Sequence, residues 1–242
     1  KINNLVLIFF LMSLSIFITS PFSLARYQIA ALYLALIFLS LKIFEKTFIF
    51  QIGLLGGLFF VFPFLDRFKN FNYENFNFKF NFNYLNKAHF DSYQNFTKVV
   101  ELNLITYGEQ LKGALLFFIP RSIWNEKPVG SGKLLSDLNN YENWNISMPF
   151  IAEGYINFGI LGSMSFMFIL GILLSNFDRI IWKLKRLNQN NLIIILYYLF
   201  FGNIFYLMRG DLMTSISYIF SITILFFIIT SVLRIAERAT FK

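Results

Sequence analysis

The sequence has no cysteine, a single histidine and few charged residues, and each shortage excludes a class of site. Without cysteine, the 242-residue chain contains neither disulfides nor thiolate metal sites. Because His89 is the single histidine, a His-based metal centre or a Ser-His-Asp triad is not expected. Charged residues make up only 14% of the chain, which is too few to cover the surface of a soluble domain of this length.

Apolar residues are abundant and occur in long runs. They form 57% of the sequence, and the mean hydropathy is +0.59. About 20 apolar residues are needed to cross a bilayer, and a segment that crosses must pair its backbone groups internally as a helix. We therefore predict an all-α polytopic membrane bundle with about six spans: Leu5–Ser20, Tyr27–Phe44, Phe48–Leu65, Tyr155–Phe177, Leu192–Leu207 and Met213–Leu233.

The short loops between these runs differ in their basic charge, which predicts the orientation. One set of loops contains only Arg26 and Arg209. The opposite set contains Lys42, Lys46, Arg179, Lys183, Lys185, Arg186, Arg234, Arg238 and Lys242. Lysine and arginine accumulate in cytoplasmic loops, so we expect both ends of this chain in the cytoplasm of a bacterial cell and the long loop outside. The expected organisation is three spans in 1–65, an extracytoplasmic loop in 66–154, and three spans in 155–242.

The chain begins at Lys1, directly in an apolar run, and two interpretations are open. We expect it to be the C-terminal part of a longer protein. The alternative is a cleaved signal peptide with Leu5–Ile18 as its apolar core and a cleavage site before Arg26.

The net charge of +8 does not indicate a nucleic-acid partner. Most of the surplus lies in the predicted cytoplasmic loops, where membrane insertion already explains it. The long outer loop contains nine basic and nine acidic residues, so it is not an arm that binds polyanions. The partner that the composition predicts is the lipid bilayer.

The outer loop begins with a connector and continues into a predicted surface helix. The stretch Phe68–Tyr84 is of low complexity, and apolar and polar residues alternate strictly in its core, Phe76–Tyr84. This pattern fits either a strand with one apolar face or an irregular connector, and we favour the connector. From about 94 to 118 the apolar residues recur with helical period, with charged residues opposite, which predicts an amphipathic helix on the outer leaflet or across the bundle mouth. Asp91 or Ser92 is placed to cap its start.

The segment Pro120–Pro128 is a candidate phosphate-binding turn. Two prolines stiffen a backbone that carries Arg121, Trp124 and Lys127, and a flexible Gly-Ser-Gly elbow follows at 130–132. Guanidinium binds phosphate oxygens bidentately and lysine adds a point charge, so the turn suits a lipid-linked phosphate. The alternative is that both cations anchor the loop to anionic headgroups or pair with Glu126.

Glu153 is a carboxylate at the outer boundary of the predicted fourth span. Such a carboxylate is costly unless it is solvated or partnered. It could act as a general base, pair with Arg121 or Arg209, or serve as a favourable anion in the first turn of a helix. The Arg-Gly-Asp string at Arg209–Asp211 is interpreted as a chance match to an adhesion signal, because its turn is held at the membrane.

Two motifs in this loop resemble a known family. The run Phe118-Ile-Pro-Arg-Ser-Ile-Trp124, followed by Lys127-Pro128, looks like the loop signature of the bacterial O-antigen polymerase (Wzy-type) family. The run from Ser147 through Glu153 to Gly162 is similar to that family's entry into its next span. Asn125-Glu126 departs from the family pattern, in which a proline-containing pair would follow the tryptophan. Members of the family have more spans than this chain, so the resemblance implies further spans upstream of Lys1.

The resemblance implies a reaction and roles for five residues. Such enzymes polymerise oligosaccharide repeat units that are carried on undecaprenyl diphosphate, at the outer face of the cytoplasmic membrane, beside a chain-length regulator and a repeat-unit flippase. The diphosphate leaving group needs cations, for which Arg121, Lys127 and Arg209 are the candidates. The acceptor hydroxyl needs a base, for which Glu153 and Asp91 are the candidates, so the catalytic set would be Glu153, Asp91 and Arg121. No metal site is visible in the sequence, and we expect transfer without a metal ion or cofactor.

Two other functions remain open at this point. A ligase that transfers finished glycan to another lipid would use the same donor with a different acceptor. A non-enzymatic translocator or flippase component would need ionisable residues along a path through its spans, and these six runs have almost none beyond their ends.

Overall fold

The computed structural model describes two compact units of the chain, Lys1–Tyr84 and Leu85–Lys242. The described residues are 10, 13–14, 17–19, 26–41, 46–61, 91–143, 146–187 and 192–240. Within these ranges the chain is helical and contains no strand, which confirms the all-α prediction for this part of the chain. The Phe/Asn-rich connector, His89 and most of the first expected span lie outside the described residues.

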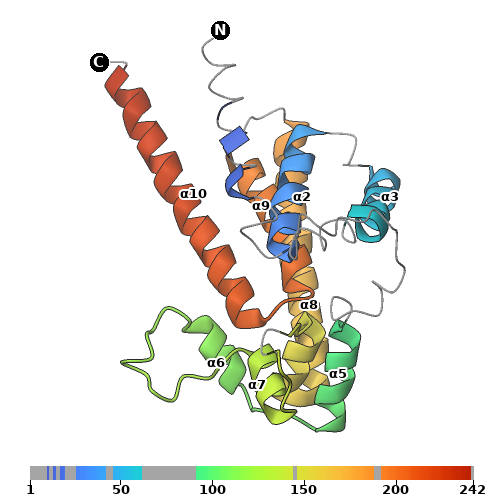
Figure 1. Cartoon of the computed structure of the whole chain (residues 1–242). Coiled ribbons are helices and arrows are strands. Elements are labelled where there is room, and N and C mark those ends of the chain that lie inside the picture. The colour runs from blue at the N-terminus through green and yellow to red at the C-terminus, as the bar shows by residue number, and fades with distance from the viewer. Residues whose placement is uncertain are drawn as a thin grey trace, which may run out of the picture. The chain divides into compact units, whose positions relative to one another are not determined.

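Two short apolar helices have their bounds in the described part of the first unit. These are α2 (Arg26–Ser40) and α3 (Thr47–Gly56), and α3 continues into a π-helical turn, η2 (Gly57–Val61) (Figure 1). The rings of Phe38 and Phe50 pack with their centroids 5.2 Å apart. Each helix begins one residue before the run that the sequence predicts as the second or third span and otherwise overlaps it.

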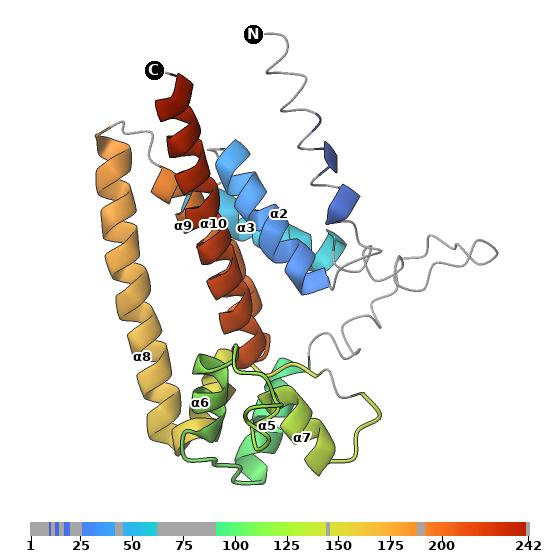
Figure 2. The same ribbon diagram turned by 90° about the vertical axis from the view of Figure 1, so that its left-hand side faces the viewer.

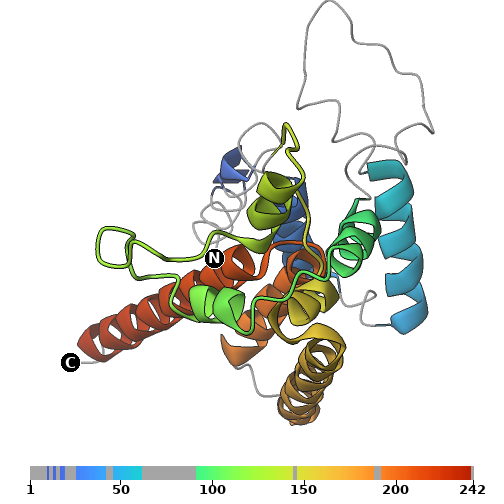
Figure 3. The same ribbon diagram turned by 90° about the horizontal axis from the view of Figure 1, so that it is seen from below.

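The described residues of the second unit form six helices, with the shorter ones gathered at one end of the longer ones. Helices α5, α6 and α7 lie beside the first part of α8 and the start of α10 (Figures 1 and 2). Helix α9 packs between α8 and α10, and α6 packs against both (Figure 3). The bounds are α5 Ser92–Glu101, α6 Glu109–Leu115, α7 Ser131–Leu138, α8 Phe150–Arg186, α9 Leu192–Leu207 and α10 Leu212–Thr240.

Two helices of this unit are long and apolar enough to cross a membrane. They are α8 and the Leu212–Ile235 part of α10, while α9 is apolar but shorter. Large apolar side chains on both, such as Phe168 and Phe227, are exposed in the isolated chain, as lipid-facing residues would be. Among the described residues of this unit, the structure thus gives candidate membrane spans at two of the predicted positions and a shorter apolar helix at the third, and the count of six spans stays a prediction.

Helix α8 is broken near its start, which the sequence did not reveal. Phe158 (φ −144°, ψ 23°) and Gly159 (φ 66°, ψ −152°) leave helical geometry and separate a short first segment from the long remainder. The two segments cross so closely that a Cβ on Gly162 would lie 2.1 Å from the carbonyl oxygen of Gly154. No charged residue occurs from Ile160 to Phe177, so the membrane-crossing stretch begins after the break.

The single surface helix expected over about 94–118 is wrong, because the structure contains two helices there. Helices α5 and α6 are separated by a turn in which Asn103, Tyr107 and Gly108 have positive φ. The turn backbone pairs with the first segment of α8: the N–H of Thr106 donates to Ile156 O at 2.6 Å, and that of Gly108 to Asn157 O at 3.0 Å. These bonds satisfy backbone carbonyl groups that lose their helical partners at the break in α8. Such tertiary hydrogen bonds cannot be predicted from the helical period of apolar residues in the sequence.

Two apolar clusters hold this end of the unit together. One joins α5, α7 and the first segment of α8 and includes Val99, Leu135 and Ile156, all fully buried. The other joins α6 to the start of α10 and includes Ala114 and Leu212. The polar side chains between these two clusters are therefore held in position by the packing of the helices that carry them.

Candidate functional site

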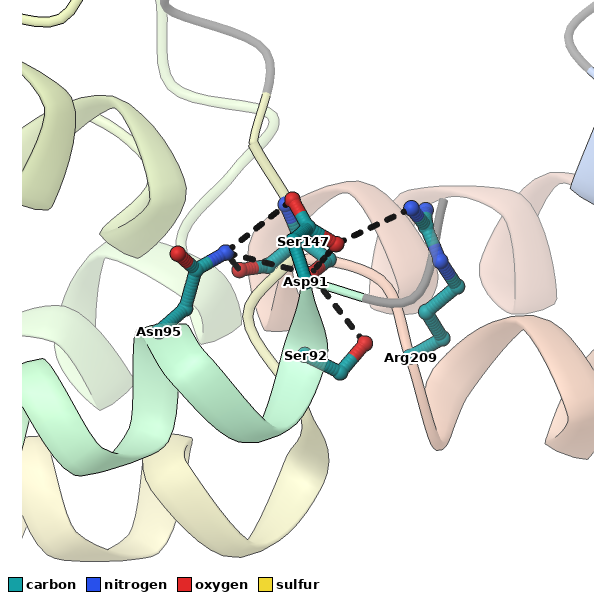
Figure 4. Close-up of polar contacts among 5 residues, drawn as sticks. All are labelled: Asp91, Ser92, Asn95, Ser147 and Arg209. Atoms are coloured by element: carbon teal, nitrogen blue, oxygen red, sulfur yellow. Dashed lines mark hydrogen bonds and ion pairs between the residues drawn. The ribbon is translucent and has the colours of Figure 1, made fainter. Parts of the chain in front are cut away.

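An ion pair joins the turn between α9 and α10 to the start of α5. The guanidinium of Arg209 lies 3.2 Å from the carboxylate of Asp91, and their side chains are 23% and 12% exposed (Figure 4). The pair is thus largely withdrawn from water, where charge attraction is stronger than at an open surface.

Asp91 also accepts hydrogen bonds from two neighbouring residues. Ser147 donates to it through its hydroxyl and, at 3.4 Å, through its backbone N–H. Asn95 donates to it at 3.2 Å and also to the carbonyl oxygen of Ser147 at 2.7 Å (Figure 4). The expected N-cap is not formed, since the Asp91 side chain makes no capping bond to α5 and binds these partners instead. The contacts fix Asp91 as an acceptor from several donors.

Glu153 is completely buried at the point where three helices meet. One carboxylate oxygen accepts a hydrogen bond from the Ser131 hydroxyl at 2.7 Å, at the start of α7. The other accepts from the backbone N–H of Leu212 at 2.8 Å, the first residue of α10. Glu153 itself lies in the first turn of α8, the position that one of the sequence interpretations gives it.

Asp211 lies next to Glu153 and brings a second carboxylate to this buried place. It accepts from the Thr214 backbone N–H at 3.1 Å, which is an N-cap of α10. Glu153 precedes the break in α8 and lies outside the membrane-crossing stretch. Burial, together with the charge of Asp211, raises the pKa of Glu153 from 4.5 to about 8, although the bonds from Leu212 and Ser131 oppose the shift.

The Gly-Ser-Gly elbow at 130–132 fits closely against these carboxylates. A Cβ on Gly130 would lie 2.4 Å from an Asp211 carboxylate oxygen, and one on Gly132 would lie 2.4 Å from the carbonyl oxygen of Ile146. The Gly132 N–H also faces Asp211, at 3.4 Å. Glycine is therefore required at both positions because other groups approach the backbone too closely for a side chain. The sequence alone suggested only that these residues are flexible.

Arg121 and Lys127 lie on the loop between α6 and α7, at residues Phe117–Pro128, which we call the arm. The arm projects to one side of the unit (Figures 1 and 3). Arg121 donates to the carbonyl oxygens of Lys127 and, at 3.0 Å, Pro128. Lys127 donates to those of Phe117 and, at 2.9 Å, Ile119. Both cations thus close the arm on itself, and neither forms an ion pair with Glu126 among the described residues.

The structure brings together some of the predicted residues and separates others. Asp91 and Arg209 form a pair, and Glu153 lies beside the same turn through Asp211 and Leu212. The predicted ion pairs of Glu153 with Arg121 or Arg209 are not formed among the described residues, because Arg209 binds Asp91 and Arg121 binds carbonyl oxygens.

Sequence reasoning missed Ser131, Ser147 and Asp211 as members of the site. Asp211 stands directly after Gly210 at the start of a long apolar run, a signal for a helix N-cap that could have drawn attention to it. No comparable signal marks the two serines. In the described part of the chain, no group of three or more His, Cys, Asp or Glu side chains could hold a metal ion.

Comparison with known protein families connects this end of the unit to a function. Residues 125–236 match the family of O-antigen polysaccharide polymerase Wzy. The predicted resemblance to the Wzy family is thereby confirmed over the C-terminal portion of the chain. The matched range includes Lys127, Glu153 and Arg209, while Asp91 and Arg121 precede it.

The matched family is one of O-antigen polysaccharide polymerases. The family comprises membrane-bound polymerases of the glycosyltransferase type, which extend a surface polysaccharide from lipid-linked repeat units. The apolar helices α8 and α9 and most of α10 lie inside the matched range, as a membrane enzyme requires. No curated protein and no solved structure matches the chain.

Proposed function

We propose that the chain polymerises oligosaccharide repeat units carried on undecaprenyl diphosphate at the outer face of the bacterial cytoplasmic membrane. The match of residues 125–236 to the Wzy family carries this proposal. The matched range begins in the arm, passes through Glu153 and ends in α10, so it includes most of the polar residues gathered at one end of the helices.

The distribution of charge along the helices supports the proposed orientation. The long part of α8 begins beside the site and ends at Lys183, Lys185 and Arg186, the basic residues of its last turn. Helix α10 likewise begins at the site and reaches Arg234 near its other end. Because basic residues favour the cytoplasmic side, the end that holds Glu153 and Arg209 would face outward.

The proposed transfer moves the growing glycan from one lipid carrier to another. The bond between the anomeric carbon and the diphosphate oxygen breaks, and undecaprenyl diphosphate leaves with the electron pair. A bond forms between that carbon and a hydroxyl oxygen of the acceptor's terminal sugar, and the hydroxyl proton passes to a base. The enzyme must therefore stabilise negative charge on the leaving group and hold the hydroxyl in line with the carbon.

Arg121, Lys127 and Arg209 are the proposed diphosphate ligands. Arg121 is exposed and has five N–H donors, of which the arm's carbonyl oxygens use only part. Lys127 is half-buried, and its ammonium group donates to the carbonyl oxygen of Phe117, the first residue of the arm. Charge from these side chains would serve the leaving group without requiring a metal ion.

Glu153 is the better supported of the two candidate bases. The carboxylate oxygens of Asp91 are already engaged by Arg209 and by the Ser147 and Asn95 side chains. The pKa of Glu153, about 8, suits a group that exchanges protons near neutral pH. Since Glu153 is buried, this role requires the Gly130–Gly132 elbow to open when substrate binds.

The test uses surface glycans in a strain that lacks its polymerase. Arg121→Ala and Glu153→Gln, introduced into the full-length protein, should leave glycans of a single repeat unit. The matched control is Glu126→Ala, an exposed residue of the same arm, which should retain the polymer ladder. Membrane levels of each variant are measured by immunoblot, and full ladders from both Arg121→Ala and Glu153→Gln would refute the site.

A further inference from the structure

The arm has a backbone that satisfies many of its own hydrogen-bonding groups. Irregular loops normally leave carbonyl oxygens to water, but here two cations and local turns supply donors. Six arm carbonyls accept a hydrogen bond in this way: those of Phe117, Ile119, Pro120, Trp124, Lys127 and Pro128. Because these carbonyl groups already accept hydrogen bonds within the protein, less free energy is needed to move the loop from water into the membrane interface.

Two large apolar side chains of the arm are exposed. Ile123 is 78% exposed and Phe118 is 61% exposed. Between them in the sequence lies Arg121, which is also exposed. Lys112 of α6 lies 5.2 Å from the centre of the Trp124 ring, which places a further cation beside the arm. Exposed apolar groups, an indole and cations together are typical of a protein surface at headgroup depth.

The arm lies against a helix that is long and apolar enough to cross the membrane. The rings of Phe117 and Phe220 pack edge-to-face with their centroids 5.3 Å apart. Phe220 lies eight residues after Leu212, about 12 Å along α10 at 1.5 Å per residue. The arm is therefore beside the first turns of a candidate span, and its exposed face is continuous with the surface that lipid would cover.

We propose that the arm docks on the membrane by inserting Phe118 and Ile123 into the leaflet that surrounds the start of α10. Lys112 and Arg121 then lie at the level of its anionic headgroups, where their charge is complementary. The occupant of this exposed surface is lipid, and the docking does not depend on which reaction the site performs.

Fluorescence of Trp124 tests the proposal in the whole chain reconstituted into vesicles of phosphatidylcholine and phosphatidylglycerol. Trp144→Phe and Trp182→Phe leave Trp124 as the single tryptophan. Lipids that carry a nitroxide near the headgroup end of the acyl chain should quench its emission strongly, whereas aqueous iodide should quench it weakly. Ile123→Asp should reduce lipid quenching severalfold and increase iodide quenching, because a charge at this position opposes insertion.

The matched control is Leu138→Asp at the end of α7, a position that is 54% exposed and outside the arm. It should leave both kinds of quenching unchanged. Strong iodide quenching of the unsubstituted arm would overturn the proposal, since the arm would then face water. Protection from both quenchers would overturn it as well, since a protein surface would then cover the arm.

Discussion

Asp91 and Arg209 are 118 residues apart in the sequence, and their side chains form an ion pair of 3.2 Å. The pair links the start of α5 to the turn between α9 and α10. Asp211, two residues after Arg209, contacts the Gly130–Gly132 elbow that follows the arm. One short turn therefore holds both α5 and the elbow.

A double-mutant cycle should detect the coupling between Asp91 and Arg209. Asp91→Asn and Arg209→Gln should each cost about 1–3 kcal/mol of unfolding free energy, because each leaves a charged partner poorly satisfied. The double variant should cost less than the two single variants together, by roughly 1 kcal/mol. Denaturant unfolding in micelles gives these values.

The control for this cycle is the exposed pair Lys98–Glu101, at 3.1 Å within α5. Its side chains are largely in solvent, so its coupling should be below about 0.5 kcal/mol. Equal coupling in the two pairs would contradict the assignment of a structural role to Asp91.

Stability should decrease as pH rises toward 8, because of Glu153. Folding raises the pKa of its carboxyl from 4.5 to about 8, so the folded state binds this proton more tightly than the unfolded state does. The contribution of this proton to the unfolding free energy is fully present below about pH 4.5. It decreases as the pH rises from 4.5 to 8 and is lost above about pH 8.

Glu153→Gln removes the titrating proton while keeping the shape of the side chain. The variant should therefore lose the part of the pH dependence that lies between pH 4.5 and 8, an effect of at most a few kcal/mol. Thermal unfolding of both proteins across this range measures the difference. Parallel pH curves for the variant and the parent would show that the carboxyl titrates normally.

The crossing within α8 should not tolerate any side chain at Gly162. A methyl group there would lie 2.1 Å from the Gly154 carbonyl oxygen and 2.8 Å from the Phe158 Cβ, so the two helical segments would have to separate. We expect Gly162→Ala to lower the unfolding free energy by more than about 2 kcal/mol. Gly171→Ala, later in the same helix and with nothing within 4 Å, should instead be neutral or stabilise by up to about 1 kcal/mol.

Asn157 should be required to hold α6 against the first segment of α8. Asn157 is fully buried. Its side-chain oxygen accepts a hydrogen bond from the Leu111 N–H at 2.7 Å, and its side-chain NH₂ donates to the backbone carbonyl oxygen of Glu153 at 2.8 Å. Asn157→Leu leaves both backbone groups without these partners and should cost about 2–4 kcal/mol. Hydrogen exchange should then show faster exchange at Leu111 than in the parent. Unchanged exchange there would contradict the role given to this amide.

The sequence predicts the membrane helices well, because their apolar runs are long and uninterrupted. The boundaries of Leu192–Leu207 match α9, and α10 begins one residue before the expected Met213. The break at Phe158–Gly159 was not predictable, since it is stabilised by tertiary hydrogen bonds from the Thr106 and Gly108 N–H groups to the carbonyl oxygens that precede it.

The candidate site was predictable in its charged residues and not in their partners. Glu153, Asp91 and Arg209 stand out in the sequence because carboxylates and guanidinium groups are rare near apolar runs. The partner of each charged side chain is decided by how the α9–α10 turn packs against α5, α7 and α8. No local sequence pattern encodes that packing. The cations of the arm illustrate the same limit, since their bonds to carbonyl oxygens follow from the loop's closure.

The Arg209–Asp211 turn also matters for how the topology of this protein is mapped. Reporter insertions are commonly placed in short connections between spans, on the assumption that such connections only join helices. Here a tag after Gly210 would part Arg209 from Asp211 and disturb the contacts of Asp91 and the Gly130–Gly132 elbow together. The exposed stretch Tyr141–Asn143 after α7 is a safer place for a tag on the same side of the unit.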